Sequence, residues 1–239
     1  MAGPTARDSA PTGAQPDPWP DLLAEDHALL DRTSTAERVA DALRQLIIDG
    51  RLLPGTRLSE QSAGKALAVS RNTLREAFRL LVHERLLVHE FHRGVYVRVL
   101  GADDVTDLYR TRRLLETGAL RGSSATRRGG LAAIEEAVAD AEQAAADERW
   151  LDVGTANMRF HQAIVALAGS PRTDEIMRQL TAELRLAFHA KPEPRPFHEP
   201  YIARNREIAT QLAAGEVDAA TRALEAYLTD AERQLLDAF

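Results

Sequence analysis

The sequence predicts a mainly α protein, in which a small N-terminal unit of three helices and a two-stranded hairpin precedes an all-α antiparallel helical bundle. Three observations predict this class. Apolar residues recur at helical spacing through most of the chain after Ser34. Strand-like runs occur only before Leu100. Gly or Pro separates the later helical segments, and the short links between them favour antiparallel neighbours.

The chain is expected to divide into residues 1–32, 33–100 and 101–239. The first part holds five of the eleven prolines. It cannot bury enough apolar surface to offset its ordering entropy, so we expect a disordered extension. Its apolar exceptions, which could dock on a folded domain, are Trp19, Leu22, Leu23, Leu29 and Leu30.

The first helix is expected to begin at the segment Ser34-Thr35-Ala36-Glu37, in which Ser34 and Glu37 have the spacing of a capping box. It should end near Gly50. Its inward side chains are expected to be Val39, Leu43, Leu46 and Ile47.

Two short helices joined by a tight turn are expected next, between Leu58 and Leu81. Ser70 can cap the second of them through its hydroxyl. That helix has an apolar face, made by Leu74, Ala77, Phe78 and Leu81. A different face carries a basic stripe of Arg71, Arg75 and Arg79. A helix with one apolar face and one basic face, preceded by a shorter helix, is typical of a helix-turn-helix that enters the major groove.

A hairpin is predicted after these helices, with strands at Leu86–Phe91 and Gly94–Val99 and the tight turn His92-Arg93-Gly94 between them. Gly94 has no Cβ, so a sugar-phosphate chain can approach its backbone closely. A hairpin with a basic turn after such a helix is a wing. The unit is therefore interpreted as a winged helix-turn-helix.

Residues from about Glu37 to Val99 resemble the DNA-binding domain of the GntR-family transcription regulators. The motifs that carry the resemblance are Gly50-Arg51-Leu52-Leu53-Pro54-Gly55-Thr56-Arg57-Leu58-Ser59-Glu60 and Val69-Ser70-Arg71-Asn72-Thr73-Leu74-Arg75-Glu76-Ala77. The family usually has Arg where this chain has Gln61. The resemblance implies a double-stranded DNA operator as partner. The contacts that it implies are Ser59, Gln61, Ser70, Arg71, Asn72, Thr73, Arg75, Arg93 and Gly94. The alternative for the arginines is a solvated helix face, and for Arg79 a phosphate contact or plain exposure.

Six helices are expected in the remaining chain, at Asp103–Thr126, Leu131–Asp147, Trp150–Ala168, Pro171–Ala190, His198–Gly215 and Val217–Ala238. Ser170 is a suitable cap before Pro171, and Gly215 is a suitable stop.

This half, from about Asp103 to Phe239, resembles the FCD-type effector domain of the FadR-like GntR regulators. The motifs are Leu108-Tyr109-Arg110-Thr111-Arg112-Arg113-Leu114-Leu115-Glu116, Asn157-Met158-Arg159-Phe160-His161-Gln162-Ala163-Ile164 and Gly215-Glu216-Val217-Asp218-Ala219-Ala220. The resemblance implies a domain that binds a small-molecule effector and forms a homodimer.

Many FCD domains hold a divalent metal, with an Asp or Asn four residues before a His and two further His. Here Asn157 and His161 match the first pair, but Asn205 and Tyr227 stand where the further His would be. Transition metals favour imidazole or thiolate ligands. We therefore expect no metal and no other cofactor, with His161 and Asn157 as the only candidate ligands. His189 and His198 flank a proline-rich loop and are expected to be solvated.

An effector pocket is expected to persist without the metal. Its expected residues are Arg112, Asn157, His161, Asn205 and Tyr227. Arg112 would anchor a carboxylate through two parallel hydrogen bonds. The alternatives are an internal ion pair from Arg112 to Glu116 at i+4, and a purely structural, hydrogen-bonded His161.

Charge is unevenly distributed along the chain, whose net charge is −6. Ser34–Leu100 has 11 Lys and Arg and 7 Asp and Glu, a net +4, so the remainder carries −10. A basic unit on an acidic chain suits a local polyanionic partner.

Composition also excludes several classes. The chain has no cysteine, so it has no disulfide, thiolate metal site or cysteine nucleophile. No apolar run approaches the roughly 20 residues that span a bilayer. No secretory signal is recognisable, so a cytoplasmic protein is expected. Only Lys65 and Lys191 are lysines among 30 basic residues, a bias typical of a GC-rich bacterial genome.

The two resemblances imply a sequence-specific DNA-binding regulator, of a class that most often represses, whose operator affinity depends on a small-molecule effector in the bundle, which we expect to be an organic acid. One alternative is a constitutive regulator whose bundle only dimerises. The other is a metal-dependent enzyme in the bundle, which would lack a full ligand set and an evident acid–base pair; we expect no catalytic residues.

Overall fold

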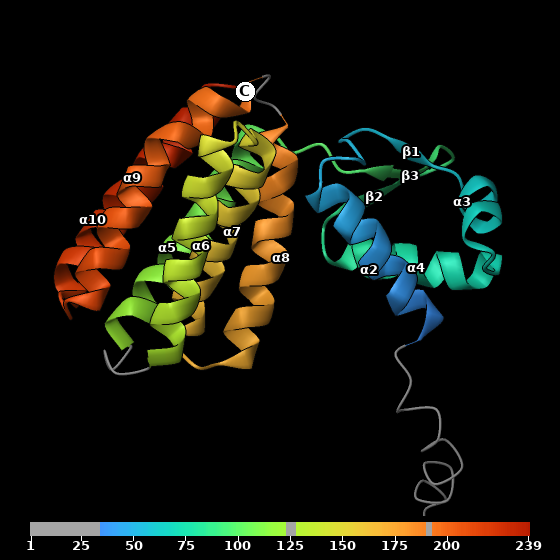
Figure 1. Ribbon diagram of the computed structural model, residues 1–239. Helices are drawn as coiled ribbons and strands as arrows, with labels where there is room; N and C mark the ends of the chain where they lie inside the picture. The colour runs from blue at the N-terminus through green and yellow to red at the C-terminus, as the bar shows by residue number, and fades with distance from the viewer. Residues whose placement is uncertain (1–33, 123–127, 190–192) are drawn as a thin grey trace, which may run out of the picture. The chain divides into compact units, whose positions relative to one another are not determined.

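The computed structural model describes residues 34–122, 128–189 and 193–239. Within them the chain forms nine helices, α2 to α10, and three short strands (Figure 1). This confirms the mainly α class. The expectation for residues 1–32 lies outside the described residues.

The winged unit contains α2 (Thr35–Ile48), α3 (Glu60–Leu67) and α4 (Arg71–His83). As predicted, α4 buries Leu74, Ala77, Phe78 and Leu81. Helix α2 buries Val39, Ala40, Leu43 and Ile47, while Leu46 is half-buried. The apolar faces of these helices form one core with Val95 and Val97 of the wing. Packing of periodic apolar faces therefore builds this unit.

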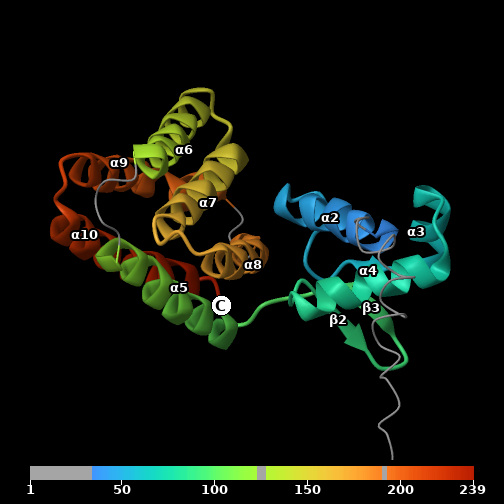
Figure 2. The same ribbon diagram turned by 90° about the horizontal axis from the view of Figure 1, so that it is seen from below.

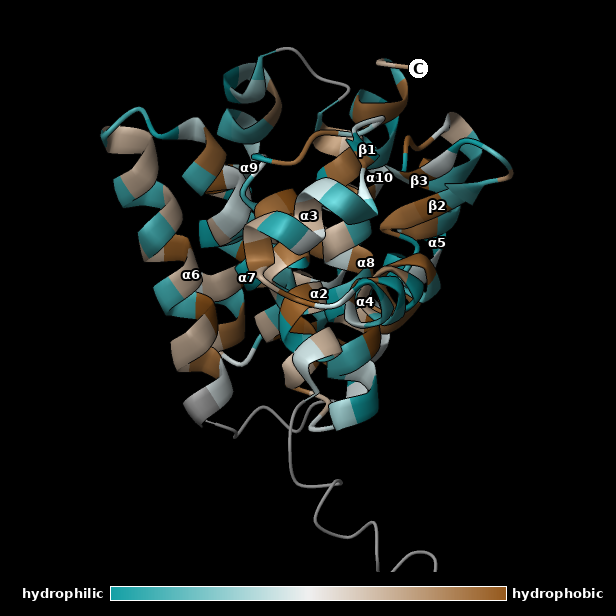
Figure 3. Cartoon of the chain, turned by 90° about the vertical axis from the view of Figure 1, so that its right-hand side faces the viewer, coloured by the Kyte–Doolittle hydropathy of each residue, from teal (hydrophilic) through white to brown (hydrophobic). Residues whose placement is uncertain are grey.

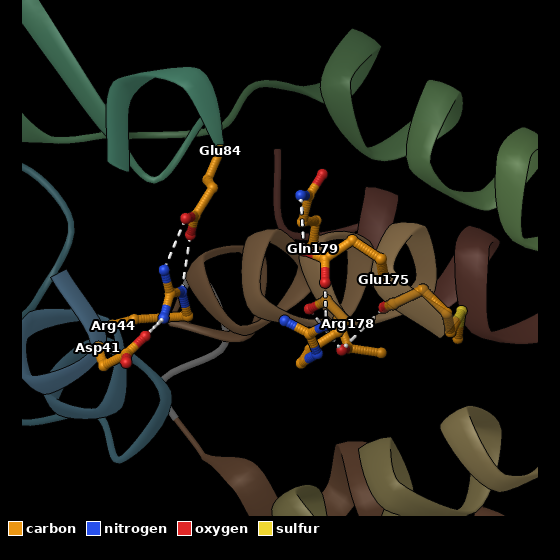
Figure 4. Close-up of polar contacts among 8 residues, drawn as sticks. Asp41, Arg44, Glu84, Glu175, Arg178 and Gln179 are labelled. Carbon is orange, nitrogen blue, oxygen red and sulfur yellow. Dashed lines mark hydrogen bonds and ion pairs between the residues drawn. The ribbon is translucent and has the colours of Figure 1, made fainter. Parts of the chain in front are cut away.

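An ion pair joins the two longer helices of the winged unit (Figure 4). The guanidinium of Arg44 in α2 donates from Nε and Nη2 to the carboxylate of Glu84, which follows α4, at 2.6 Å each. Asp41, one turn before Arg44, also accepts from it. Two parallel bonds restrict the geometry more than a single contact does, so this pair fixes where α4 ends relative to α2.

Ser70 caps α4 as the sequence predicts. Its Oγ accepts a hydrogen bond from the backbone N–H of Thr73 at 3.1 Å, and its hydroxyl also bonds that of Thr73 at 2.8 Å. We expect Ser70→Ala to cost the winged unit about 1 kcal/mol of unfolding free energy, because a first-turn N–H loses its acceptor. Thermal unfolding followed by circular dichroism measures this. Ser62→Ala, an exposed serine of α3, is the control, and an equal effect of both changes would contradict the assignment.

The wing contains one strand more than predicted. Strands β2 (Leu87–Glu90) and β3 (Gly94–Val97) form the expected hairpin, and β1 (Arg57–Leu58) adds to its other side in the order β1-β3-β2. Arg57 pairs with Tyr96, and Leu58 with Val95. The assignment of Leu58 to the helical stretch was therefore wrong. A two-residue strand has too little alternation to be recognised before its partner is in place.

The second half is a helical bundle with no strand among its described residues, as expected. Its helices are α5 (Ala102–Gly122), α6 (Arg128–Ala146), α7 (Trp150–Ala166), α8 (Pro171–Phe188), α9 (Pro194–Ala213) and α10 (Val217–Leu236). Helix α6 packs along α7, and α10 packs along both α5 and α9 (Figure 2). Apolar and polar residues alternate around the helices, as an amphipathic bundle requires (Figure 3).

Helix α9 begins earlier than predicted, at Pro194 rather than His198. Proline is tolerated in the first turn because the N–H groups there have no intrahelical acceptor. Pro200 lies deeper and cannot donate to the carbonyl of Pro196. The side chain of Gln234 in α10 donates to that carbonyl instead, at 3.1 Å. The proline-rich segment was therefore wrongly read as a loop up to His198.

Ser170 precedes α8 as expected, with Pro171 in the first turn, but its hydroxyl makes no capping hydrogen bond. This part of the prediction was wrong. The hydroxyl of Thr173 instead donates to the carbonyl of Ser170 at 2.9 Å. Among the helices described, none has both the length and the apolar character needed to cross a bilayer.

Candidate functional site

The exposed face of α4 is the first candidate site. This face carries three arginines that are exposed to solvent and lie opposite the buried side chains of the helix, namely Arg71, Arg75 and Arg79. Arg79 pairs with Glu76 at 2.5 Å, and Arg75 lies 3.9 Å from Glu60. Exposed pairs of this kind contribute little stability, so phosphates or base edges can replace the carboxylates at small cost. The stripe is therefore available to a polyanion.

A hollow of about 460 Å³ lies beside this stripe in the winged unit. It is lined by Arg57, Leu58, Ser59, Glu60, Gln61, Arg71, His89, Gly94 and Val95. It thus brings together Ser59, Gln61, Arg71 and Gly94, four of the predicted contacts that are far apart in the sequence. The sequence reasoning missed two of its residues, Arg57 and His89. Only strand pairing places them here, because β1 and β2 both flank β3.

The remaining predicted contacts lie around the hollow rather than in its lining. Asn72 is exposed in the first turn of α4, where the hydroxyls of Ser70 and Thr73 bond each other. Arg93 lies at the wing tip, 72% exposed, and pairs with Glu90 at 2.9 Å. Gly94 has φ of +110°, a conformation that favours glycine, so the turn requires it for its own geometry.

A second candidate site is a buried polar centre in the bundle, formed by Arg112, Glu116, Asn157, His161, Asn205 and Tyr227. One half is a chain of charges. Nε of Arg112 donates to Glu116 at 2.8 Å, and the other oxygen of Glu116 lies 2.6 Å from Nδ1 of His161. The internal ion pair that the sequence left open is therefore the arrangement formed, and Glu116 joins α5 to α7.

The other half of the polar centre is neutral. Oδ1 of Asn157 accepts from the hydroxyl of Tyr227 at 2.8 Å and from Nδ2 of Asn205 at 2.7 Å. These bonds connect α7, α10 and α9. The rings of His161 and Tyr227 are 5.0 Å apart, edge to face. All five residues proposed from the resemblance therefore belong to one connected group, although four different helices supply them.

Burial and charge act together in this polar centre. Burial lowers the pKa of His161, so the neutral ring is favoured despite the adjacent carboxylate. Burial alone would raise the pKa of Glu116, but Arg112 and His161 outweigh it and hold the pKa below its ordinary value. Burial raises the pKa of Tyr227, which stays a neutral hydrogen-bond donor.

Three polar atoms of the centre are buried without a hydrogen-bond partner among the described residues: Nη2 of Arg112, Nε2 of His161 and Oδ1 of Asn205. Buried polar groups are nearly always satisfied, by protein, water or a ligand. Nδ1 of the neutral His161 ring carries the proton that is donated to Glu116, so its Nε2 is an acceptor. The centre therefore offers a bound molecule one unused donor, on Arg112, and two unused acceptors, on His161 and Asn205.

The same geometry does not fit the metal that FCD domains often hold. The oxygen of Asn157 already accepts two hydrogen bonds, and Tyr227 is neutral. His161 is the only imidazole of the set. The described residues contain no group of three or more His, Cys, Asp or Glu arranged to hold a metal ion. Both oxygens of the Glu116 carboxylate are already bonded, one to Arg112 and the other to His161. A borderline metal would therefore find one free strong ligand here, against the three or four that it needs.

His198 was expected to be solvated and is buried instead, 4% exposed. The early start of α9 carries it into the bundle, where its ring packs against Phe188 and Phe197 at 5.1 and 5.0 Å between centroids. His189 is half-buried, and its enclosed Nε2 has no hydrogen-bond partner in the described part of the chain. The expectation that these two histidines are solvated was therefore wrong, because it assumed a loop up to His198 where helix α9 already begins at Pro194.

Acid should destabilise the bundle through His198. Burial, and then the neighbouring Arg185, lower the pKa of His198 from 6.5 to about 4. The unfolded chain therefore takes up this proton first, so the stability is present above pH 6.5 and is lost as pH falls towards about 4. We expect a contribution of roughly 3 kcal/mol. Urea unfolding at a series of pH values should show a shallower loss for His198→Gln than for the control His83→Gln. Equal slopes would contradict the expectation.

Both halves of the chain are similar to known proteins. Residues 35–97 match the family described as bacterial regulatory proteins, gntR family, and residues 107–230 match the FCD domain. The chain is 31% identical over 201 residues to the uncharacterized HTH-type transcriptional regulator BphR of Paraburkholderia xenovorans, covering 75% of this chain and 80% of that protein. It is 26% identical to a probable D-xylose utilization operon transcriptional repressor of Paenarthrobacter nicotinovorans, covering 82% and 86%.

A solved structure is also similar. A GntR transcriptional regulator from Rhodococcus sp. RHA1 superposes with a TM-score of 0.83 at 47% identity, covering 87% of this chain and all of that one.

Proposed function

This chain belongs to the GntR family of bacterial regulatory proteins and carries an FCD domain, and from that premise we propose that it is a repressor that releases a two-fold operator when a small organic acid binds in the bundle. The family consists of transcription regulators and not enzymes.

One observation carries the DNA-binding part of the proposal. The recognition helix α4 presents a row of arginines beside a hollow whose wall includes Arg57, Arg71 and the glycine of the wing. A cationic helix N-terminus and a wing on one side of a small domain suit simultaneous contact with a major groove and its flanking phosphates. Arg57 and His89 join the predicted contacts in this proposal.

Selection from a random duplex library tests this proposal. We expect enrichment of a palindrome whose half-site centres are about one helical turn, roughly 10 base pairs, or a multiple of it apart, because a two-fold dimer offers two recognition helices. Light scattering on the full-length protein should report two chains without DNA. A strictly monomeric protein that enriches no sequence would refute the proposal. A palindrome whose binding no metabolite changes would favour the constitutive alternative.

The effector part of the proposal is supported by the unpartnered polar atoms of the polar centre. Nη2 of Arg112 can donate to an oxygen of a bound molecule, and Nε2 of His161 and Oδ1 of Asn205 can accept from its hydroxyl groups. Binding there would bridge α5, α7 and α9. Because half-site spacing is fixed by the duplex, a small change in the placement of two winged units is enough to weaken DNA binding.

The protein is also proposed to act without a metal. We expect it to purify without a stoichiometric transition metal, and we expect a chelator to leave its melting temperature unchanged, since His161 is the one strong ligand of the polar centre. Elemental analysis and thermal unfolding with and without the chelator measure this. One tightly held metal per chain that disappears in His161→Ala would overturn the expectation.

A further inference from the structure

A second buried cation lies in the bundle, apart from the polar centre. Arg185 of α8 is 2% exposed, yet it forms no ion pair within residues 34–122, 128–189 and 193–239, and its Nε has no hydrogen-bond partner there. By contrast, Arg112 is equally buried but is neutralised by Glu116. Burying a guanidinium without a counter-charge is costly, so a residue held in this way needs an explanation.

The surroundings of Arg185 are built around a glycine. A Cβ on Gly154 of α7 would lie 2.7 Å from Nε2 of His198 and 3.0 Å from Nη1 of Arg185, closer than side chains tolerate. Glycine at this position therefore lets the guanidinium and the imidazole approach the α7 backbone together. We refer to Arg185, His198 and Gly154 as the Arg185 cluster.

The Arg185 cluster contains no anion of its own. Burial lowers the pKa values of Arg185 and His198, and the positive charge of Arg185 further lowers that of His198. Asp49 and Asp152 attract Arg185 but neither forms an ion pair with it. Asp49 accepts a hydrogen bond from Gln45 at 2.7 Å, and Asp152 pairs with Arg149 at the surface of α7. The site thus has one uncompensated positive charge, that of Arg185. Around it lie the neutral imidazole of His198 and the aromatic rings of Phe188 and Phe197.

The cluster and the polar centre share two helices. On α9, His198 precedes Asn205 by seven residues, which is two turns or about 10 Å along the same helix face. On α7, Gly154 precedes His161 by the same interval. The Arg185 cluster therefore lies along the same inner faces as the polar centre, about two turns away.

We propose that the acid group of the effector is bound by Arg185 in this cluster, because the charge of Arg112 is already balanced by Glu116 whereas Arg185 forms no ion pair among the described residues. The effector class is a small organic carboxylate with an apolar body that fits beside Phe188 and Phe197. A carboxylate satisfies both the Nε–H and the charge of Arg185, whereas a water molecule would satisfy only the hydrogen bond. This inference rests on the proposed ligand-responsive function and specifies its ligand.

Calorimetric titration of the full-length protein tests the inference with matched probes of two sizes. The probes are acetate against acetamide and benzoate against benzamide, with inorganic phosphate as a different anion. We expect at least one carboxylate to bind while its neutral amide and phosphate do not. Failure of both carboxylates, equal binding of an amide, or binding of phosphate alone would overturn the inference.

Arg185→Gln is the decisive variant. It should weaken carboxylate binding about tenfold or more, because a charged hydrogen bond is lost. It should also raise the melting temperature of the free protein, since a desolvated, unpaired charge is removed. Arg178→Gln on the same helix is the control and should change neither, because Arg178 is exposed and pairs with Glu175 (Figure 4). A destabilised Arg185→Gln that binds carboxylate as the wild type does would show a structural role only.

A second variant leaves the charge in place. Gly154→Ala introduces a Cβ into the cluster and should weaken carboxylate binding, whereas Gly118→Ala in α5, where a Cβ would meet no atom within 4 Å, should not. Equal binding by both alanine variants would contradict the inference.

Mobility shift assays separate this inference from the proposed function. A protein that binds carboxylate through Arg185 but binds no DNA sequence selectively would refute the proposed regulator function. A protein that binds its operator selectively but binds no carboxylate through Arg185 would refute only the role of Arg185.

Discussion

Replacing both Arg71 and Arg75 with alanine is expected to abolish the preference of this protein for its operator over random duplex. Both side chains project from the solvent face of α4, and neither contributes to the core of the winged unit. A bidentate contact with a guanine edge is worth about 1–3 kcal/mol, so two lost contacts should reduce operator affinity by roughly two to four orders of magnitude. Thermal stability should be unchanged, because the altered atoms lie on solvent.

Binding isotherms on operator and random duplexes at several salt concentrations measure this effect. Arg79→Ala is the comparison, since Arg79 lies two turns into the helix and pairs with Glu76. We expect Arg79→Ala to weaken both duplexes about equally and to lower the salt dependence, as loss of a phosphate contact does. Operator affinity at the wild-type level in the double variant would exclude α4 as the recognition helix.

The largest stability effect is expected from Glu116→Gln. The Glu116 carboxylate is fully buried and compensates the charge of Arg112 while bonding His161. Removing its charge leaves a buried guanidinium unpaired, which typically costs about 3–5 kcal/mol. Urea unfolding should show this loss, whereas Glu225→Gln, whose partner Arg121 is exposed, should have almost no effect.

The pH dependence of stability provides an independent test of the role of Glu116. Its pKa is held below the ordinary value in the folded protein, so its contribution is present above the unfolded pKa and is lost as pH falls through the folded one. Glu116→Gln should therefore remove part of the acid sensitivity as well as part of the stability. A variant as stable as the wild type would show that the bonds of the Glu116 carboxylate to Arg112 and His161 are not needed to stabilise the bundle.

Much of the winged unit was predictable because its signals are local. The buried face of α4 is defined by the spacing of Leu74, Ala77, Phe78 and Leu81. The hydroxyl of Ser70 caps the N-terminus of the same helix. Such patterns act between residues at most four apart, so they hold before any tertiary contact forms. Strand β1 has no such pattern. Arg57 and Leu58 adopt a strand because β3 offers them hydrogen-bond partners.

The polar centre divides in the same way. Sequence motifs assembled Arg112, Asn157, His161, Asn205 and Tyr227 into one candidate set, and these residues do form one connected group. Their roles inside it depend on distances that no spacing along the chain determines. The spacing of Arg112 and Glu116 on α5 allows their ion pair, but only packing of α5 against α7 brings His161 to the other oxygen of Glu116.

The sequence by itself determined the fold class, the DNA-binding unit and the family, because periodicity, caps and ordered motifs are properties of neighbouring residues. Only the tertiary structure decided that His198 is buried, that Arg185 forms no ion pair with any residue that the structure describes, and that Gly154 makes room for both. The burial of a group and the balance of charge around it depend on all the atoms that surround it. They therefore appear only when α7, α8 and α9 are packed together.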